Sequence, residues 1–261
     1  MSLLKSYPCL LPFIYSTLVM LAVVESIKLV GLQNKTKRSF NNTRKLLHVL
    51  AGTIFIALWS KFPNSDPTSA YWAAAVPFGM TAKFVAVALG LIPSKSDVLL
   101  MSRTGSRLEL LKGPALYGLS IFFLTLLDFK SIAASSAILS MCFGDGFAEV
   151  FGVFCSSYRL LGRRLDWNVN KSWAGFAACC AFSSLGIFLS FYLASVYDWV
   201  DWVDVVKPNI GFREVVKISC FGGCIAGLVE SLPIKDVDNV LLPLSVYIFV
   251  KSGTTMEFIA K

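Results

Sequence analysis

The apolar residues of this chain are gathered into long blocks, and most of the charged residues lie between the blocks. Residues 8–30, 70–92 and 173–196 are each long enough to cross a membrane, because a hydrocarbon core of about 30 Å takes about 20 helical residues. Five further blocks, shorter or interrupted by polar residues, follow at the same rhythm: 46–59, 114–127, 132–154, 215–232 and 240–250. The pattern predicts eight membrane crossings, with seven or nine as the alternatives.

The predicted crossings are helices, because a backbone in lipid finds no water to bond and the strands of a membrane barrel would alternate apolar and polar residues. The composition agrees: 56% of the residues are hydrophobic and 15% are charged, against roughly a quarter charged in soluble domains. The sequence therefore predicts an all-α, polytopic transmembrane helix bundle. No internal repeat or low-complexity segment interrupts it, so residues 1–261 are expected to form a single domain.

The basic residues gather in alternate loops, which predicts how the chain is oriented. Most of them fall between the first and second blocks, the third and fourth, and the fifth and sixth. The positive-inside rule places these loops on the cytosolic side or its equivalent, such as a plastid stroma. The net charge of +8 follows largely from this bias, and no segment resembles a nucleic-acid module, so we expect no nucleic-acid partner. The first block is long enough to remain as a helix rather than be cleaved as a signal peptide.

Two acidic residues stand inside the fifth block, in the run GDGFAE at 144–149. Charged groups inside a membrane are costly and are functional candidates for that reason. Asp145 and Glu149 are four residues apart, so on a helix they share one face. Adjacent carboxylates are tolerated when a cation lies between them, and Mg²⁺ (or Mn²⁺) held also by substrate phosphates fits such a pair, with Gly144 and Gly146 leaving room for the ligand. The alternative is a helix end at which two acids simply reach water.

The loops predicted to be cytosolic supply complementary positive charge. Arg103 and Lys112 lie between the third and fourth blocks, and Lys171 and Ser172 lie at the start of the sixth. A helix N-terminus with a cation and a hydroxyl is a good phosphate site, because free backbone amides point outward there. We therefore expect these residues and the carboxylates to form a nucleotide or phosphate site at one membrane surface. The chain has neither the GxxxxGK[ST] phosphate loop nor the catalytic loop of protein kinases.

Four other polar residues need an explanation. Lys83 stands inside the third block, so a carboxylate or phosphate partner is expected. Glu230 ends the seventh block, and Asp238 opens the eighth. His48 is the single histidine, at the entry to the second block, where it is either an interfacial anchor or a general base.

The chain carries five ordered motifs between residues 40 and 245: RKLLH (44–48), MSR (101–103) with ELLKGP (109–114), GDG (144–146), NKSWAG (170–175), and LVESLP (228–233) with DN (238–239). In order and spacing they resemble the membrane-bound prenol kinases of plants and cyanobacteria, such as phytol kinase and farnesol kinase. Dolichol kinase and CDP-diacylglycerol synthase are similar more distantly.

The resemblance implies that the chain transfers a phosphoryl group from CTP to an isoprenoid alcohol, phytol first and farnesol or geranylgeraniol next, at a bilayer surface. It implies a plastid membrane, with the endoplasmic reticulum as the alternative. The implied metal ligands are Asp145, Glu149, Glu230 and Asp238. The implied nucleotide-binding residues are Arg103, Glu109, Lys112, Gly144, Gly146, Lys171, Ser172 and Lys83. Asp145 or His48 would accept the proton of the alcohol.

This sequence departs from the usual pattern of the family after the GDG motif. After the glycine-aspartate-glycine run the family usually has alanine-aspartate and then glycine-arginine, whereas this chain has Ala148-Glu149 and then Gly152-Val153. Arg159, Arg163 or Arg164, from the inserted segment 154–167, would have to replace the missing arginine. Two other functions stay open from the residues alone. One is a transporter with a relay of intramembrane carboxylates, and the other is a lipid cytidylyltransferase.

Overall fold

A computed structural model describes residues 7–33, 37–157, 162–199, 210–234 and 237–255. The chain packs as two compact units, with the boundary between Phe129 and Lys130. Arg159, one of the three arginines of the inserted segment, lies outside the described residues, whereas Arg163 and Arg164 lie within them.

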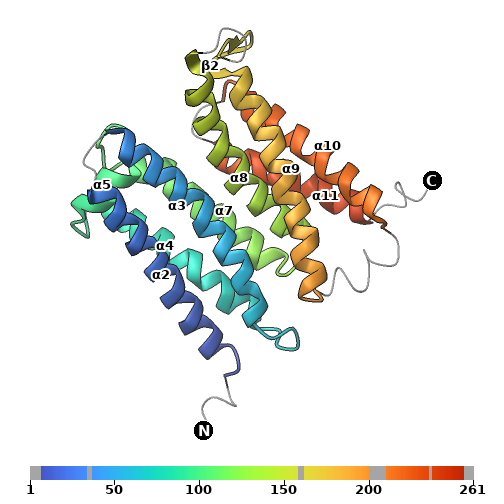
Figure 1. Ribbon diagram of the computed structural model, residues 1–261. Coiled ribbons are helices and arrows are strands. Elements are labelled where there is room, and N and C mark those ends of the chain that lie inside the picture. The colour runs from blue at the N-terminus through green and yellow to red at the C-terminus, as the bar shows by residue number, and fades with distance from the viewer. Residues whose placement is uncertain (1–6, 34–36, 158–161, 200–209, 235–236, 256–261) are drawn as a thin grey trace. The chain divides into compact units, whose positions relative to one another are not determined.

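The described residues are mostly helical, which confirms the predicted fold class (Figure 1). The first unit contains α2 (Leu10–Gln33), α3 (Lys37–Leu58), the 3-10 turn η1 (Trp59–Lys61), α4 (Ser69–Leu89), α5 (Lys95–Met101), α6 (Glu109–Lys112) and α7 (Pro114–Leu127). The second unit contains α8 (Ile132–Phe154), the 3-10 turn η2 (Cys155–Ser157), strands β1 (Arg164–Leu165) and β2 (Asn168–Ser172), α9 (Trp173–Val196), α10 (Phe212–Ser231) and α11 (Asp238–Thr255).

Every predicted apolar block is occupied by a helix. Within the described ranges, five stretches are long and apolar enough to cross a bilayer: α2, α4, α6 with α7, α8 and α9. Helices α3, α10 and α11 occupy the other three blocks but carry more polar residues. Helix α3 begins well before its apolar block, because the run from Lys37 to Lys45 contains neither glycine nor proline and continues the helix. The chain is a multi-pass membrane protein.

In the first unit, α4 packs along α7, and α2 packs along both α3 and α4. The short helix α5 contacts α2, α3 and α4, while α6 contacts α4 and α7. Apolar side chains from α2, α3, α4, α5 and α6 meet in one core cluster, which includes Val24, Leu47, Phe84, Met101 and Leu110. The cluster fixes α5 and α6, and with them the basic loop between these two helices, at one end of the unit.

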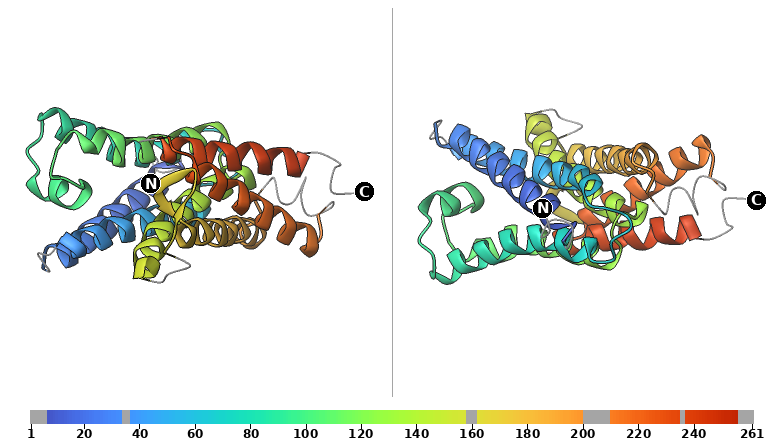
Figure 2. Two further views of the ribbon diagram at one scale, coloured as in Figure 1. Left: turned by 90° about the horizontal axis from the view of Figure 1, so that it is seen from above. Right: turned by 90° about the horizontal axis from the view of Figure 1, so that it is seen from below.

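In the second unit, four helices close a bundle: α8 contacts α9, α9 contacts α10, α10 contacts α11, and α11 returns to α8. The four helices lie side by side in both views of Figure 2. Small residues allow this close packing, as they do between membrane helices in general. A Cβ on Gly186 would meet the Leu139 carbonyl at 2.7 Å, and Gly223 lies as closely against Ser184 and the Cys180 backbone.

A two-stranded hairpin precedes α9, and the sequence did not predict it. Strands β1 and β2 are antiparallel, with Arg164 paired to Ser172 and Leu165 to Asn168. Leu165 is buried, and the Ser172 hydroxyl caps α9 by accepting the Gly175 amide at 3.1 Å. The hairpin therefore delivers the NKSWAG motif from a strand directly into a helix N-terminus (Figure 1).

Candidate functional site

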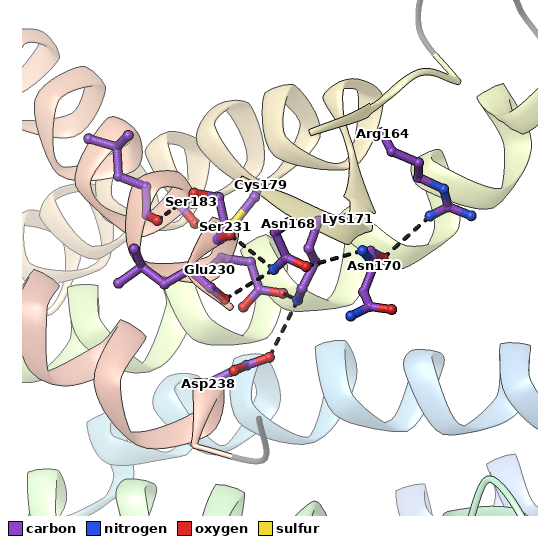
Figure 3. A network of polar contacts seen from close by, with 11 residues as sticks. Arg164, Asn168, Asn170, Lys171, Cys179, Ser183, Glu230, Ser231 and Asp238 are labelled. Carbon is purple, nitrogen blue, oxygen red and sulfur yellow. Dashed lines mark hydrogen bonds and ion pairs between the residues drawn. The ribbon is translucent and has the colours of Figure 1, made fainter. Parts of the chain in front are cut away.

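Lys171 lies among carboxylates at the hairpin end of the second unit. Its ammonium group pairs with Glu230 Oε1, at the last turn of α10, and lies 3.4 Å from Asp238 Oδ2, at the first turn of α11 (Figure 3). Asp145 of α8 acts electrostatically on both Lys171 and Glu230. Three segments far apart in the sequence thus bring one lysine and three acids together.

Among the described residues, the one ammonium group of Lys171 lies under the influence of three carboxylates. Burial disfavours the charge on Lys171, but Glu230, Asp238 and Asp145 outweigh it and raise the pKa of the ammonium group above its ordinary value. The side chain of Glu230 is 5% exposed, and its second oxygen, Oε2, is buried without a hydrogen-bond partner. A buried carboxylate oxygen without a partner is expensive, so the cluster can accept a further cation or donor.

A metal ion at this cluster stays a prediction. No group of three or more His, Cys, Asp or Glu side chains is placed to hold one, as far as the described residues go. Mg²⁺ is usually held by one or two carboxylates together with substrate phosphates. One or two of Asp145, Glu230 and Asp238 would supply the hard oxygen ligands that this mode of binding needs, with substrate phosphates completing the set.

The other motif residues of this unit lie close by in the sequence but differ in their contacts. Asp145 and Glu149 lie one turn apart on α8, and both are half-buried. Gly144 faces α9, where an added Cβ would meet the Ser183 hydroxyl and the Cys179 thiol at 3.2 Å. Close helix packing therefore accounts for glycine at 144. Gly146 is buried on the same helix.

Ser172 and Lys171 flank the start of α9, as the sequence predicts. Lys171 belongs to strand β2 and Ser172 is the N-cap residue. The Ser172 oxygen accepts a backbone hydrogen bond, and its proton remains able to donate to an anion at the positive end of the helix dipole.

In the first unit, Lys83 has the carboxylate partner that its position inside an apolar block predicts. Its ammonium group lies 3.0 Å from Asp97 Oδ2. Lys28 pairs with Asp97 Oδ1 and with Glu25, and the Ser94 hydroxyl donates to Asp97 Oδ2 at 2.7 Å. Burial alone would raise the pKa of Asp97, but hydrogen bonds from Lys28, Ser94 and Lys83 hold it below its ordinary value.

Glu109 organises the loop that joins α5 to α6. Its carboxylate accepts hydrogen bonds from the Arg103 amide at 2.5 Å, the Thr104 amide at 3.1 Å and the Thr104 hydroxyl at 2.9 Å. Glu109 thus places the loop that bears Arg103, and its binding of the nucleotide stays a prediction. The side chains of Arg103 and Lys112 are exposed, and their binding of phosphate stays a prediction.

His48 lies on α3 against the ring of Tyr117 from α7. The ring centroids are 4.3 Å apart, and the Tyr117 hydroxyl donates to the His48 carbonyl at 2.8 Å. This packing agrees with the anchoring role for His48. Its role as a base is untested.

Sequence reasoning missed three residues of these networks. Neither Lys28 nor Asp97 lies in one of the five motifs, although a lysine at the edge of an apolar block already requires a partner. Asn168 was also missed, because the recognised motif begins at Asn170. Its side chain joins the hairpin to the end of α10.

Together, the fold and the cluster define an all-α, multi-pass membrane protein with lysine and acidic residues grouped at one end of a helix bundle. The chain is 32% identical over 219 residues to a probable phytol kinase, chloroplastic, of Triticum aestivum, covering 82% of this chain and 68% of the relative. It is 30% identical over 228 residues to phytol kinase 1, chloroplastic, of Arabidopsis thaliana, covering 86% and 69%. It is 32% identical over 203 residues to the chloroplastic farnesol kinase of the same plant, covering 76% and 60%.

The chain belongs to the phytol kinase and farnesol kinase family, as its five motifs indicated. No protein-family model matches it. No solved structure matches it either.

Proposed function

We propose that this protein is a kinase that transfers a phosphoryl group from a nucleoside triphosphate, CTP first, to an isoprenoid alcohol held in the bilayer. Relatives named phytol kinase and farnesol kinase support the acceptor. The observation that carries the proposal is the grouping of Lys171, Glu230, Asp238 and Asp145, which come from three of the five motifs, at the N-terminal end of α9.

Phosphoryl transfer depends on positioning and on charge neutralisation more than on covalent help from the protein. Lys171 supplies the positive charge for the triphosphate, and the N-terminus of α9 with the Ser172 hydroxyl supplies a helix dipole and a donor. Glu230 and Asp238 hold the Lys171 ammonium group in place until the anionic substrate competes for it. Their carboxylates then gain an unpaired negative charge, which a cation must balance.

Mg²⁺, or Mn²⁺, is the cation that we propose for this role. When bound, it would neutralise the phosphate oxygens on which negative charge gathers during transfer. Asp145, Glu230 and Asp238 are the carboxylates that would hold it, with Glu149 on the next turn of α8 as a further candidate. Asp145 and His48 are the candidates to accept the proton of the alcohol.

The acceptor that we propose is a prenol of 15 to 20 carbons, phytol before farnesol or geranylgeraniol. About 0.8 kcal/mol for each buried CH₂ group keeps such a chain in the bilayer, so the hydroxyl group would meet the triphosphate at the membrane surface. Selectivity along the tail should be loose, because one methylene in an apolar pocket discriminates by only about 1–3 kcal/mol. The names of the relatives favour a plastid membrane.

The direct test is to incubate the purified protein in vesicles with prenols, Mg²⁺ and CTP labelled at either the γ- or the α-phosphate. Transfer of the γ-label to the prenol supports the kinase. Transfer of the α-label to an anionic lipid as CMP supports a cytidylyltransferase, and no transfer in an intact, folded protein contradicts both enzymes. Competition among phytol, farnesol, geranylgeraniol and dolichol at equal membrane mole fraction, and among CTP, UTP and ATP, then ranks the substrates.

A further inference from the structure

Asn168 is a buried polar residue that none of the proposed catalytic roles uses. It is the first residue of β2, three positions before Lys171, and only 6% of it is exposed. Its amide nitrogen, Nδ2, donates to the Ser231 carbonyl at 3.0 Å and to the Leu232 carbonyl at 3.1 Å. Its oxygen, Oδ1, accepts the Asn170 amide at 3.1 Å.

These three hydrogen bonds require the side-chain amide of asparagine. Two N–H groups bond two carbonyls, and one oxygen bonds one backbone N–H, so each polar atom has a partner. The two carbonyls belong to the C-terminal end of α10, where backbone oxygens have no partner within the helix. Asn168 therefore caps α10 from another element of the fold, as Figure 3 shows.

The contact sets the position of Lys171 relative to Glu230. Ser231 directly follows Glu230, so the clamp holds the last turn of α10 against the same strand that carries Lys171. Trp167 reinforces it, because its indole N–H donates to the Ser231 hydroxyl at 3.1 Å. Residues 167, 168 and 171 of the hairpin thus contact residues 230–232 at the C-terminal end of α10.

We infer that Asn168 is a positioning residue for phosphoryl transfer: it clamps the hairpin to the end of α10 and so places the Lys171 ammonium group at Glu230 and Asp238. The inference rests on the proposed function for its effect on catalysis, although the clamp itself does not. Trp167 acts with Asn168 as the second, weaker half of the clamp.

The first experiment measures the clamp without any substrate. Acetic anhydride modifies exposed lysine side chains. It is applied to the folded, membrane-embedded protein, and mass spectrometry then gives the rate of modification at Lys171. Asn168→Ala should raise this rate by at least about tenfold, because two of the three hydrogen bonds that it removes join the hairpin to the end of α10. Val169→Ala, a change at the exposed neighbouring residue on the same strand, should leave the rate at its wild-type value. An unchanged rate in Asn168→Ala would overturn the inference.

The second experiment measures catalysis with the labelled triphosphate. Asn168→Ala should raise the KM for the nucleotide by about tenfold and leave the KM for the prenol unchanged, because only the placement of Lys171 is disturbed. Asn168→Asp should be worse than Asn168→Ala, since a carboxylate would face two carbonyls. A loss that falls equally on both KM values, or on the amount of folded protein alone, would mean that Asn168 only supports the fold.

Two further comparisons distinguish a failure of the clamp from a failure of the proposed function. Trp167→Phe removes one hydrogen bond while the ring remains, so it should shift both measurements in the same direction by a smaller factor, and it serves if Asn168→Ala does not fold. If the wild-type protein phosphorylates no prenol, the proposed function fails while the Lys171 modification rates still test the clamp. If the wild type is active and the modification rate of Lys171 does not respond, the clamp fails alone.

Discussion

The two units each contain a cluster of lysine and acidic side chains, and the described residues pair differently in the two clusters. In the first unit, two lysines, Lys28 and Lys83, share the one buried carboxylate of Asp97. In the second, the single ammonium group of Lys171 is shared by Glu230 and Asp238, with Asp145 acting on it as a third acid. Each oxygen of Asp97 has a lysine ammonium group beside it, whereas among the described residues only one oxygen of Glu230 does.

We interpret this difference as that between a cluster that supports the fold and a cluster that binds substrate. Asp97 is 1% exposed and is bonded by both lysines and by Ser94, so it fastens α5 to α2 and α4. The Oε2 atom of Glu230 is buried without a hydrogen-bond partner, which leaves the second cluster with capacity for a cation. We therefore expect the Asp97 cluster to hold the fold and the Lys171 cluster to bind the charged substrate.

The largest expected effect is at Asp145. Asp145→Asn removes one charge at nearly constant shape, and we expect phosphoryl transfer to fall by about 100- to 1000-fold or more, with insertion and expression preserved. Asp166→Asn is the matched control, because Asp166 is exposed and pairs only at the surface with Arg163. Turnover close to wild type in Asp145→Asn would remove Asp145 from the chemistry.

Variants of Lys171 test whether the effect of its ion pair on stability can be separated from its effect on catalysis in the second unit. Lys171→Met should lose activity and also destabilise the unit, by about 3 kcal/mol or less, because it leaves buried Glu230 unpaired while Lys171 itself is partly exposed. Adding Glu230→Gln should restore thermal stability but not activity. A double variant that regains phosphoryl transfer would show that Lys171 is a structural residue, like the lysines of the first unit.

A variant of Asp97 tests the expectation that the cluster in the first unit supports the fold and not the chemistry. Asp97→Asn leaves two lysines without a buried counter-charge, so we expect a loss of about 3–5 kcal/mol in stability, seen as a lower unfolding temperature and less folded protein. Activity per folded molecule should stay close to wild type. Glu25→Gln, at the exposed partner of Lys28, should change stability by about 0–1 kcal/mol. A specific loss of activity in Asp97→Asn, at normal stability, would contradict the structural role.

The smallest effect is a difference in pH dependence between the two clusters. The folded-state pKa of Asp97 lies below its ordinary value of 3.8, so its stabilisation is complete above that value and is lost as the pH falls through the folded-state pKa. The pKa of Lys171 lies above its ordinary value of 10.5, so its stabilisation is complete below 10.5 and is lost as the pH rises further. Hydrogen exchange should show α5 loosening first in acid and the hairpin first in alkali, and the reverse order would contradict this assignment.

Much of the fold could be predicted because membrane helices are encoded locally. The expected blocks at 114–127, 132–154 and 173–196 coincide with the observed α7, α8 and α9, since lipid requires each segment to satisfy its own backbone. The hairpin was missed because its strands are short and polar and depend on Ser231 and Leu232 for support. Its second strand reads NVNKS, which has no apolar alternation that would predict a strand.

The sequence by itself determined the class of protein, the helices and the family, because local patterns and ordered motifs specify each of these. Only the tertiary structure decided which charged side chains pair with one another. Lys83 required a carboxylate or a phosphate, and the packing of α5 against α4 supplies Asp97. Lys171 pairs with residues 59 and 67 positions further along the chain. Such contacts depend on how helices and a hairpin pack together, which no local pattern of residues specifies.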